Sequence, residues 1–396
     1  MRAAGLALLA VAQAALAQGR TDDLYVNPTL LVSSSRLTAM AGASVGIGEG
    51  SEGMAANYAA VAQRSPRRTR RWDWDTTFSL LGTPVDTDKD LENDSKPSTD
   101  AQPIEAQVGF YLQYLKFGLG GFGRFSTRDL CLDAQCSERL SATTTHGGLV
   151  VGAAFWEDQL LVAAGFNLTQ ARFTTLSEDV TYSGTSFGVG GLLRLHHLPF
   201  RIGASFLLGH LGLRGSDSGD TLAGRPLYAG IVTPHKLAIG ASMRLGPGSE
   251  RYNRVSKSLV DEQPKYAGAK VLPYDDLHDV PAGAWLLSVQ LDAVLPVANA
   301  TTVRSFLFGE PALPTGASFY VVPRLGVENE LLPKRLRLRL GTWLEPNLVQ
   351  GSQVRPHGTF GFEVFVFRLY DDWSISAALD AAPRYFAASI GIGWWR

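Results

Sequence analysis

Large apolar residues alternate with small or polar residues along most of this chain. In residues 335–341 arginine and leucine alternate strictly, so in an extended strand the guanidinium groups face one side and the leucines face the other. A helix would spread both sets around its circumference. The same period of two recurs in about fourteen segments, which predicts two-faced β-strands near residues 72–81, 104–115, 117–126, 146–156, 159–173, 182–195, 200–213, 235–246, 282–295, 317–330, 335–344, 357–368, 373–381 and 384–395.

The connections between these segments alternate in length. Tight turns and long polar segments follow one another, with turns at 157–158, 196–199, 332–334 and 370–372, and long segments at 82–103, 127–145, 214–234, 297–316 and 345–356. This pattern is typical of a transmembrane barrel with apolar residues toward lipid and polar residues toward the lumen. We therefore expect an all-β fold, a transmembrane antiparallel β-barrel of about fourteen strands over residues 72–396.

One connection does not fit this scheme. Residues 247–281 form a long segment where a short turn is expected. Either they contain a structured insertion, or the strand count differs there, within a range of about twelve to sixteen.

The first residues have the pattern of a secretory signal peptide. Arg2 is followed by an apolar run and then by Ala15-Leu16-Ala17, which predicts a signal peptide over residues 1–17, with a buried N-terminal helix as the alternative. No later segment offers about eighteen consecutive apolar residues, so a membrane location requires a barrel. The expected location is the outer membrane of a Gram-negative-type bacterium, in contact with its lipid.

Residues 18–71 differ from the rest of the chain. They contain a Gly/Ala-rich run with Gly42, Gly46 and Gly48, followed by Asn57-Tyr58-Ala59. Small residues with little period-two alternation predict a compact, partly helical plug in the lumen of the barrel. An exposed N-terminal extension is the alternative.

Two parts of the chain resemble a known family. The run from Arg36 to Ala59 is similar to the N-terminal segment of the FadL-type outer-membrane transport family, in which a Gly/Ala-rich stretch and an acidic turn precede Asn-Pro-Ala. Asn57 and Ala59 match this motif, and Tyr58 stands in place of the proline. Three later stretches resemble the same family, namely Pro323–Asn329, Leu338–Trp343 and Arg355–Phe362.

This resemblance implies a barrel with an N-terminal hatch in its lumen and passive uptake of hydrophobic or amphipathic small molecules, such as long-chain fatty acids. A related branch of the PorV type implies an alternative, a non-transporting barrel that acts as a scaffold for protein secretion, motility or surface assembly. A transporter needs an apolar pocket between plug and wall, whereas a lumen packed with charge pairs favours a scaffold. A large soluble secreted β-protein is a third hypothesis.

Three arginines of the alternating strand are expected to face the lumen. Arg335, Arg337 and Arg339 would repel one another without acidic partners. Glu363 on the next strand has lumenal parity, and Glu49 or Glu52 of the predicted plug offer further carboxylates. These charges either brace the plug against the wall or form a ladder for an anionic substrate.

The remaining chemistry is sparse. Cys131 and Cys136 lie close together in a polar segment without nearby histidines, which favours a local disulfide over a metal site. The seven histidines have no Gly-x-Ser-x-Gly partner motif and no metal-ligand spacing, so we expect no enzyme activity, no metal and no cofactor. A formal net charge of -1 gives no reason to expect nucleic-acid binding.

Overall fold

The computed structural model describes residues 23–26, 34–64, 71–82, 104–131, 138–215, 221–253, 284–298, 300–309, 311–333, 335–348, 354–369, 371–383 and 385–394. The predicted signal peptide, Cys136 and the side chain of Cys131 lie outside the described residues, so the disulfide stays a prediction. Within these ranges no helix is long and apolar enough to cross a membrane.

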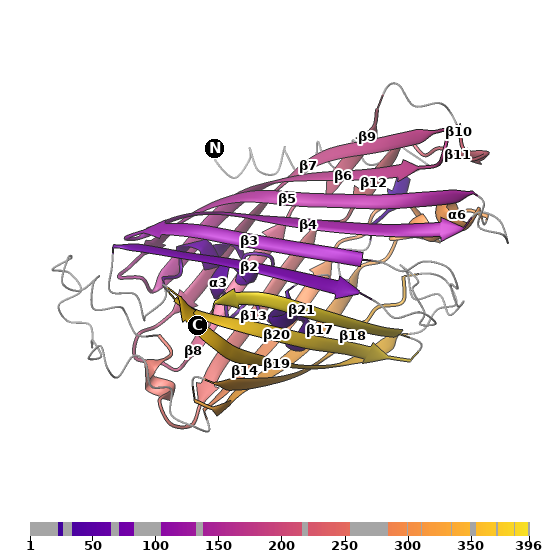
Figure 1. Ribbon diagram of the computed structural model, residues 1–396. Coiled ribbons are helices and arrows are strands. Elements are labelled where there is room, and N and C mark those ends of the chain that lie inside the picture. The colour runs from indigo at the N-terminus through magenta and orange to yellow at the C-terminus, as the bar shows by residue number, and fades with distance from the viewer. Residues whose placement is uncertain are drawn as a thin grey trace, which may run out of the picture.

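The predicted all-β barrel is confirmed. In the described part of the chain, fourteen strands form a closed antiparallel barrel in chain order (Figure 1). The barrel closes where the last strand pairs with the first, from Phe78 opposite Ile392 to Gly82 opposite Ala388. Its strands are β2 (Trp72–Gly82), β3 (Ile104–Tyr114), β4 (Phe117–Cys131), β5 (Arg139–Phe155), β6 (Leu160–Thr174), β7 (Asp179–Arg194), β8 (Phe200–Leu207), β13 (Lys236–Leu245), β14 (Trp285–Val294), β17 (Tyr320–Leu332), β18 (Leu336–Glu345), β19 (Arg355–Leu369), β20 (Asp371–Ala382) and β21 (Tyr385–Trp394).

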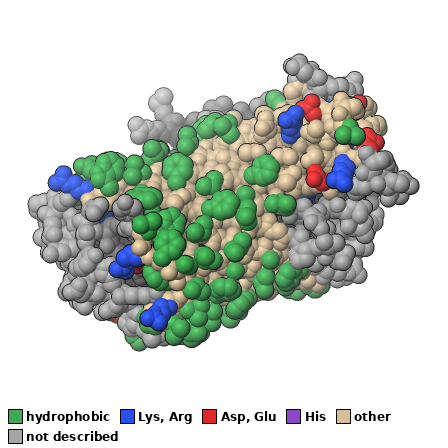
Figure 2. All heavy atoms as spheres, in the orientation of Figure 1, with side chains coloured by type: hydrophobic (Ala, Val, Ile, Leu, Met, Phe, Trp, Pro, Cys, Tyr) green, Lys and Arg blue, Asp and Glu red, His purple; other side chains and the backbone are tan. Residues whose placement is uncertain are grey.

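The two faces of the wall differ in the way that the alternation predicts. On β6, Leu160, Val162 and Phe166 are exposed, whereas Leu161 and Asn167, at positions of the opposite parity, are fully buried. Figure 2 shows hydrophobic side chains spread over the outer face of the barrel, with charged side chains toward its ends. Apolar groups outside and polar groups inside suit a wall surrounded by lipid.

The end of the barrel with the longer connections carries extra short elements. They are β1 (Asp23–Tyr25), β9 (His210–Arg214), β10 (Thr221–Leu222), β11 (Arg225–Pro226), β12 (Gly230–Thr233), β15 (Ala300–Thr302), α6 (Val303–Phe308) and β16 (Pro314–Thr315). β1 lies between β12 and β15 and is parallel to both. Leu24 of β1 and Phe306 of α6 pack with Phe173 and Tyr182 on the inner face of β6 and β7. We call this packed group the apolar cap, because it covers this end of the lumen.

Residues 34–64 lie inside the barrel, and we call them the lumenal segment. They include α2 (Ser35–Ala39), α3 (Gly50–Gly53) and the 3-10 helix η1 (Tyr58–Ala62). The Ser34 hydroxyl caps α2 by accepting a hydrogen bond of 3.3 Å from the Leu37 amide. The segment is packed so closely against the wall that a Cβ added at Gly203 of β8 would overlap the carbonyl oxygen of Val45. Glycine is therefore required there by the close approach of two backbones.

The connection after β13 returns toward the lumen. Gly246 and Gly248 have positive φ angles of 89° and 76°, and the 3-10 helix η2 (Ser249–Arg251) follows. Tyr252 and Asn253 are then buried, with exposed fractions of 3% and 0%. The rest of the long segment at residues 247–281 lies outside the described residues, so whether it contains a structured insertion stays untested.

Candidate functional site

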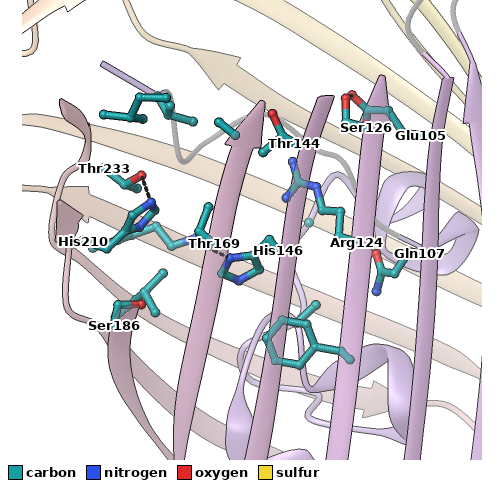
Figure 3. Close-up of a pocket in the computed structure, with 18 of the residues that line it drawn as sticks. Glu105, Gln107, Arg124, Ser126, Thr144, His146, Thr169, Ser186, His210 and Thr233 are labelled. Atoms are coloured by element: carbon teal, nitrogen blue, oxygen red, sulfur yellow. Dashed lines mark hydrogen bonds between the residues drawn. The ribbon is translucent and has the colours of Figure 1, made fainter. Parts of the chain in front are cut away.

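A cavity of about 300 Å³ lies between the apolar cap and the lumenal segment. Leu37, Ala55 and Tyr58 of the lumenal segment line one side of it, and Val26 and Leu307 line the side toward the cap. Side chains from β3 to β9 and from β12, β13, β14 and β17 form the wall, part of which is drawn in Figure 3. The cavity is therefore lined by elements from distant parts of the chain.

Much of the cavity lining is apolar. Phe122, Phe173, Leu207 and Ile231 contribute carbon surface from four different strands. Small side chains such as Ala142 lie between them. A cavity lined mainly by apolar groups with a few polar ones is typical of a small-molecule site.

The charged side chains of the cavity are unevenly paired. Arg324 forms an ion pair with Asp292 at 2.8 Å, and Arg128 lies 3.8 Å from Glu105. Arg124 and Lys236 also line the cavity, and in the described part of the chain their side chains form no ion pair or hydrogen bond. The lining thus has four lysine or arginine side chains and two carboxylates, Glu105 and Asp292, and this excess of positive charge favours an anionic group.

Neutral polar groups surround these two cations. The His146 imidazole hydrogen-bonds the Thr169 hydroxyl at 2.7 Å, and His210 hydrogen-bonds Thr233 at 3.3 Å (Figure 3). Gln107 lies opposite Arg124 in the β3–β4 register, and among the described residues its buried side-chain amide has no hydrogen-bond partner. The polar groups come from strands all around the wall, so polar side chains alternate with the apolar ones in the cavity lining.

A buried ion cluster lies between the lumenal segment and strands β17 to β19. Arg339 bonds Glu328 at 2.6 Å and also bonds Glu363. Arg337 lies 3.4 Å from Glu330 and 3.6 Å from Glu363. Arg36 of the lumenal segment joins the cluster through Glu328 at 3.2 Å. The cluster therefore links the segment to the wall and is separate from the residues that line the cavity.

The structure brings some of the predicted lumenal charges together and leaves one out. Arg337, Arg339 and Glu363 meet, but Arg335 is exposed in the turn before β18, so its predicted lumenal position is wrong. The alternation breaks there because the chain turns, with the Arg335 amide donating to the Leu332 carbonyl. Glu328 and Glu330 were missed, although their alternate positions in β17 place them opposite Arg339 and Arg337 across a tight hairpin.

The acids of the lumenal segment pair differently from the expected pattern. Glu49 bonds Arg201 of β8 at 2.6 Å and Arg36 at 3.2 Å. Burial alone would raise the pKa of Glu49, but these two guanidinium groups hold that pKa at about 2. Glu52 lies 3.7 Å from Arg36, and burial raises its pKa despite this neighbour. The segment is thus held in the lumen by ion pairs to two wall strands, β8 through Glu49 and β17 through Arg36.

The predicted plug motif has definite positions in the lumenal segment. Gly42 lines the cavity, Gly46 lies so close to β13 that an added Cβ would be 2.8 Å from the Ala241 backbone, and Gly48 has a φ of 56°. The Asn57 amide donates to the carbonyls of Val45 and Gly191, both at 2.9 Å, and Ala59 is fully buried in η1.

Tyr58 has two contacts that a proline would not provide. Its hydroxyl donates to Asn167 Oδ1 at 2.7 Å, and its ring lines the cavity. Burial raises the pKa of Tyr58 to about 12, so the hydroxyl stays a donor at neutral pH. Tyr58 therefore connects η1, β6 and the cavity.

Comparisons with known proteins identify the fold. No family model matches the sequence, and no curated protein matches it either. A crystal structure of a FadL homologue from Pseudomonas aeruginosa is similar, with a TM-score of 0.52 and 9% identity over 92% of this chain and 99% of that chain. The toluene transporter TodX of P. putida has a TM-score of 0.50 and 11% identity over 91% of this chain and 98% of that chain. The chain thus has the fold of a FadL-type outer-membrane barrel.

Proposed function

We propose that this barrel takes up hydrophobic or amphipathic small molecules passively, and that its preferred substrates have an acidic head group and a carbon chain, as long-chain fatty acids do. The observation that carries the proposal is a cavity with a largely apolar lining and an excess of positive charge, in which Arg124 and Lys236 form no ion pair among the described residues. An acidic head would pair with these cations while its chain lies along Phe122, Phe173 and Leu207.

The fold supports the same proposal. The two similar barrels are described as a FadL homologue and a toluene transporter, and both share the arrangement of the wall. In this proposal residues 1–17 direct export, residues 18–71 form a plug and residues 72–396 form the barrel. Uptake would require no catalysis and no cofactor, because the substrate only moves through the lumen.

A scaffold that transports nothing is less well supported. Charge pairs do fill the part of the lumen around Arg339, as a scaffold would allow. The cavity above the lumenal segment, however, contains unpaired cations beside apolar surface, and a purely structural core would gain nothing from that combination.

Binding of a fluorescent acid tests this proposal. Purified barrel in detergent is titrated with a dansyl-labelled undecanoate, and the double variant Arg124→Met/Lys236→Met is compared with Arg335→Met, which removes an exposed arginine. Each charge-assisted hydrogen bond contributes about 1.5–3 kcal/mol, so losing both cations should weaken binding by at least about 100-fold. Equal affinity for the double variant and the control would exclude the cavity as an acid-binding site.

A further inference from the structure

The described part of the connection after β13 ends at Asn253. This residue makes a cluster of contacts that the proposed function does not use. The Asn253 side-chain amide donates to the carbonyls of Leu195, Leu198 and Phe200, at 3.1, 2.8 and 2.8 Å. Its oxygen accepts a hydrogen bond of 2.8 Å from Arg201 Nε. Asn253 is fully buried, and both the nitrogen and the oxygen of its side-chain amide are hydrogen-bonded to the protein.

Tyr252 holds the same arginine from its other side. The Arg201 guanidinium lies 3.7 Å from the centre of the Tyr252 ring and donates to the Tyr252 carbonyl at 2.6 Å. The Tyr252 hydroxyl hydrogen-bonds Ser242 at 2.7 Å. We call Arg201, Tyr252 and Asn253 the clasp.

The clasp holds one turn of the lumenal segment. Arg201 Nη1 donates to the Ile47 carbonyl at 2.9 Å and to the Glu49 carboxylate at 2.6 Å. Ser242, which bonds Tyr252, donates to the Gly46 carbonyl at 2.7 Å. Met40 and Ile47 belong to the same buried hydrophobic cluster as Tyr252. Residues 46–49 are therefore hydrogen-bonded by two wall residues, Arg201 of β8 and Ser242 of β13, and both of these are in turn bonded by the connection after β13.

The clasp and the apolar cap lie at opposite ends of the barrel. β7 ends and β8 begins at Leu195–Phe200, which is the short-turn end of the barrel, whereas the apolar cap lies at the opposite end. On β8 and β13 the cavity is lined by Leu207 and Ala238, whereas residues 46–49 bond Arg201 and Ser242, which lie nearer the short-turn end of the same two strands. The turn held by the clasp thus separates the cavity from the short-turn end, which faces the periplasm in an outer-membrane barrel.

We infer that the clasp is a latch on the periplasmic side of the lumen. While Tyr252 and Asn253 hold Arg201, the turn at residues 46–49 stays closed. When they move away, Arg201 loses its orientation, Ile47 and Glu49 lose their partner, and the lumen opens toward the periplasm. Tyr252 and Asn253 are positioning residues, because they act through Arg201. The inference goes beyond the proposed function, since it concerns closure of the lumen whatever molecule passes through it.

The latch is tested without any substrate. Asn253→Asp keeps the size of the side chain but replaces the group that donates to three carbonyls with acceptors only. Asn329→Ala is the matched control, because the Asn329 amide also donates to a backbone carbonyl, that of Ala284 at 2.9 Å, without contacting the lumenal segment. Hydrogen exchange of residues 44–49 and ion conductance in planar bilayers are measured for both variants and the wild type.

For Asn253→Asp we expect exchange at residues 44–49 to be faster by at least about tenfold and conductance to increase, while the barrel keeps its heat-modifiable migration on gels. Tyr252→Phe, which loses only the bond to Ser242, should show a smaller change in the same direction. Unchanged exchange and conductance in a folded Asn253→Asp barrel would overturn the inference. Failure of both clasp variants to assemble, with normal assembly of Asn329→Ala, would overturn it as well, because the clasp would then serve assembly and not closure.

Discussion

Arg339 is the residue whose removal should destabilise the wall most clearly. Its side chain is 1% exposed and bonds the carboxylates of Glu328 and Glu363 on the two neighbouring strands. Arg339→Met keeps most of the side-chain volume and removes the charge. Two buried carboxylates then lose a shared partner, and each would need to stay charged in a lumen that offers little water.

The expected loss in the free energy of unfolding depends on the partners that Glu328 and Glu363 keep in the Arg339→Met variant. Breaking a buried pair by removing one member costs about 3–5 kcal/mol. Glu328 keeps Arg36 at 3.2 Å, and Glu363 keeps Arg337 at 3.6 Å and the Ser374 hydroxyl at 2.6 Å. We therefore expect the lower end of this range, about 3 kcal/mol. Arg339→Met/Glu328→Gln should recover part of the lost stability, because the double variant also removes one of the two carboxylate charges that have lost Arg339 as a partner.

Urea unfolding in lipid vesicles, followed by tryptophan fluorescence, measures this change. Arg335→Met is the control, since Arg335 is exposed in a turn and its replacement should alter the free energy of unfolding by less than about 0.5 kcal/mol. An Arg339→Met barrel as stable as Arg335→Met would refute the bracing role. If acid uptake fell at the same time, the anionic-substrate ladder would be the better explanation of these arginines.

Three further predictions concern other parts of the barrel. The folded-state pKa of Glu49, about 2, lies below its ordinary value of 4.5, so the carboxylate stabilises the fold above pH 4.5 and this stabilisation is lost as the pH falls toward 2. Glu49→Gln should remove this part of the acid-induced loss of stability, as measured by urea unfolding curves over a series of pH values. Gly203→Ala should destabilise by about 1–3 kcal/mol, because the new methyl group overlaps the Val45 carbonyl, whereas Gly82→Ala, with no atom within 4 Å, should change little in the same assay. Val289→Arg, at an exposed position near the middle of β14, should cost about 2–4 kcal/mol in lipid, and a loss below about 1 kcal/mol would contradict a lipid-facing position.

The sequence predicted the wall well because its signal is local. Lipid and lumen impose a period of two on each strand, so the parity of Arg337 and Arg339 could be read without knowing the neighbouring strands. The same rule was wrong for Arg335, since the strand begins one residue later, at Leu336. Turn geometry, and not hydrophobicity, decides where alternation stops.

The cavity could not be predicted in the same way. Arg124 and Lys236 lie on β4 and β13, and they share a cavity only because the barrel closes around the lumenal segment. The clasp is a similar case, because Asn253 belongs to a connection whose sequence shows only that it is too long for a turn. Glu328 and Glu330 could have been found by pairing β17 with β18 across their short turn, since the hairpin register places them opposite Arg339 and Arg337.

Uptake by living cells tests the central claim most directly. Cells with this barrel as their only route for such molecules are given a radiolabelled long-chain fatty acid or the alcohol of the same chain length. Wild-type barrel should take up the acid faster than the alcohol, and Arg124→Met/Lys236→Met should lose that preference while staying at normal levels in the outer membrane. Equal preference for the acid in wild type and double variant would contradict the assignment of the cavity as the acid-binding site.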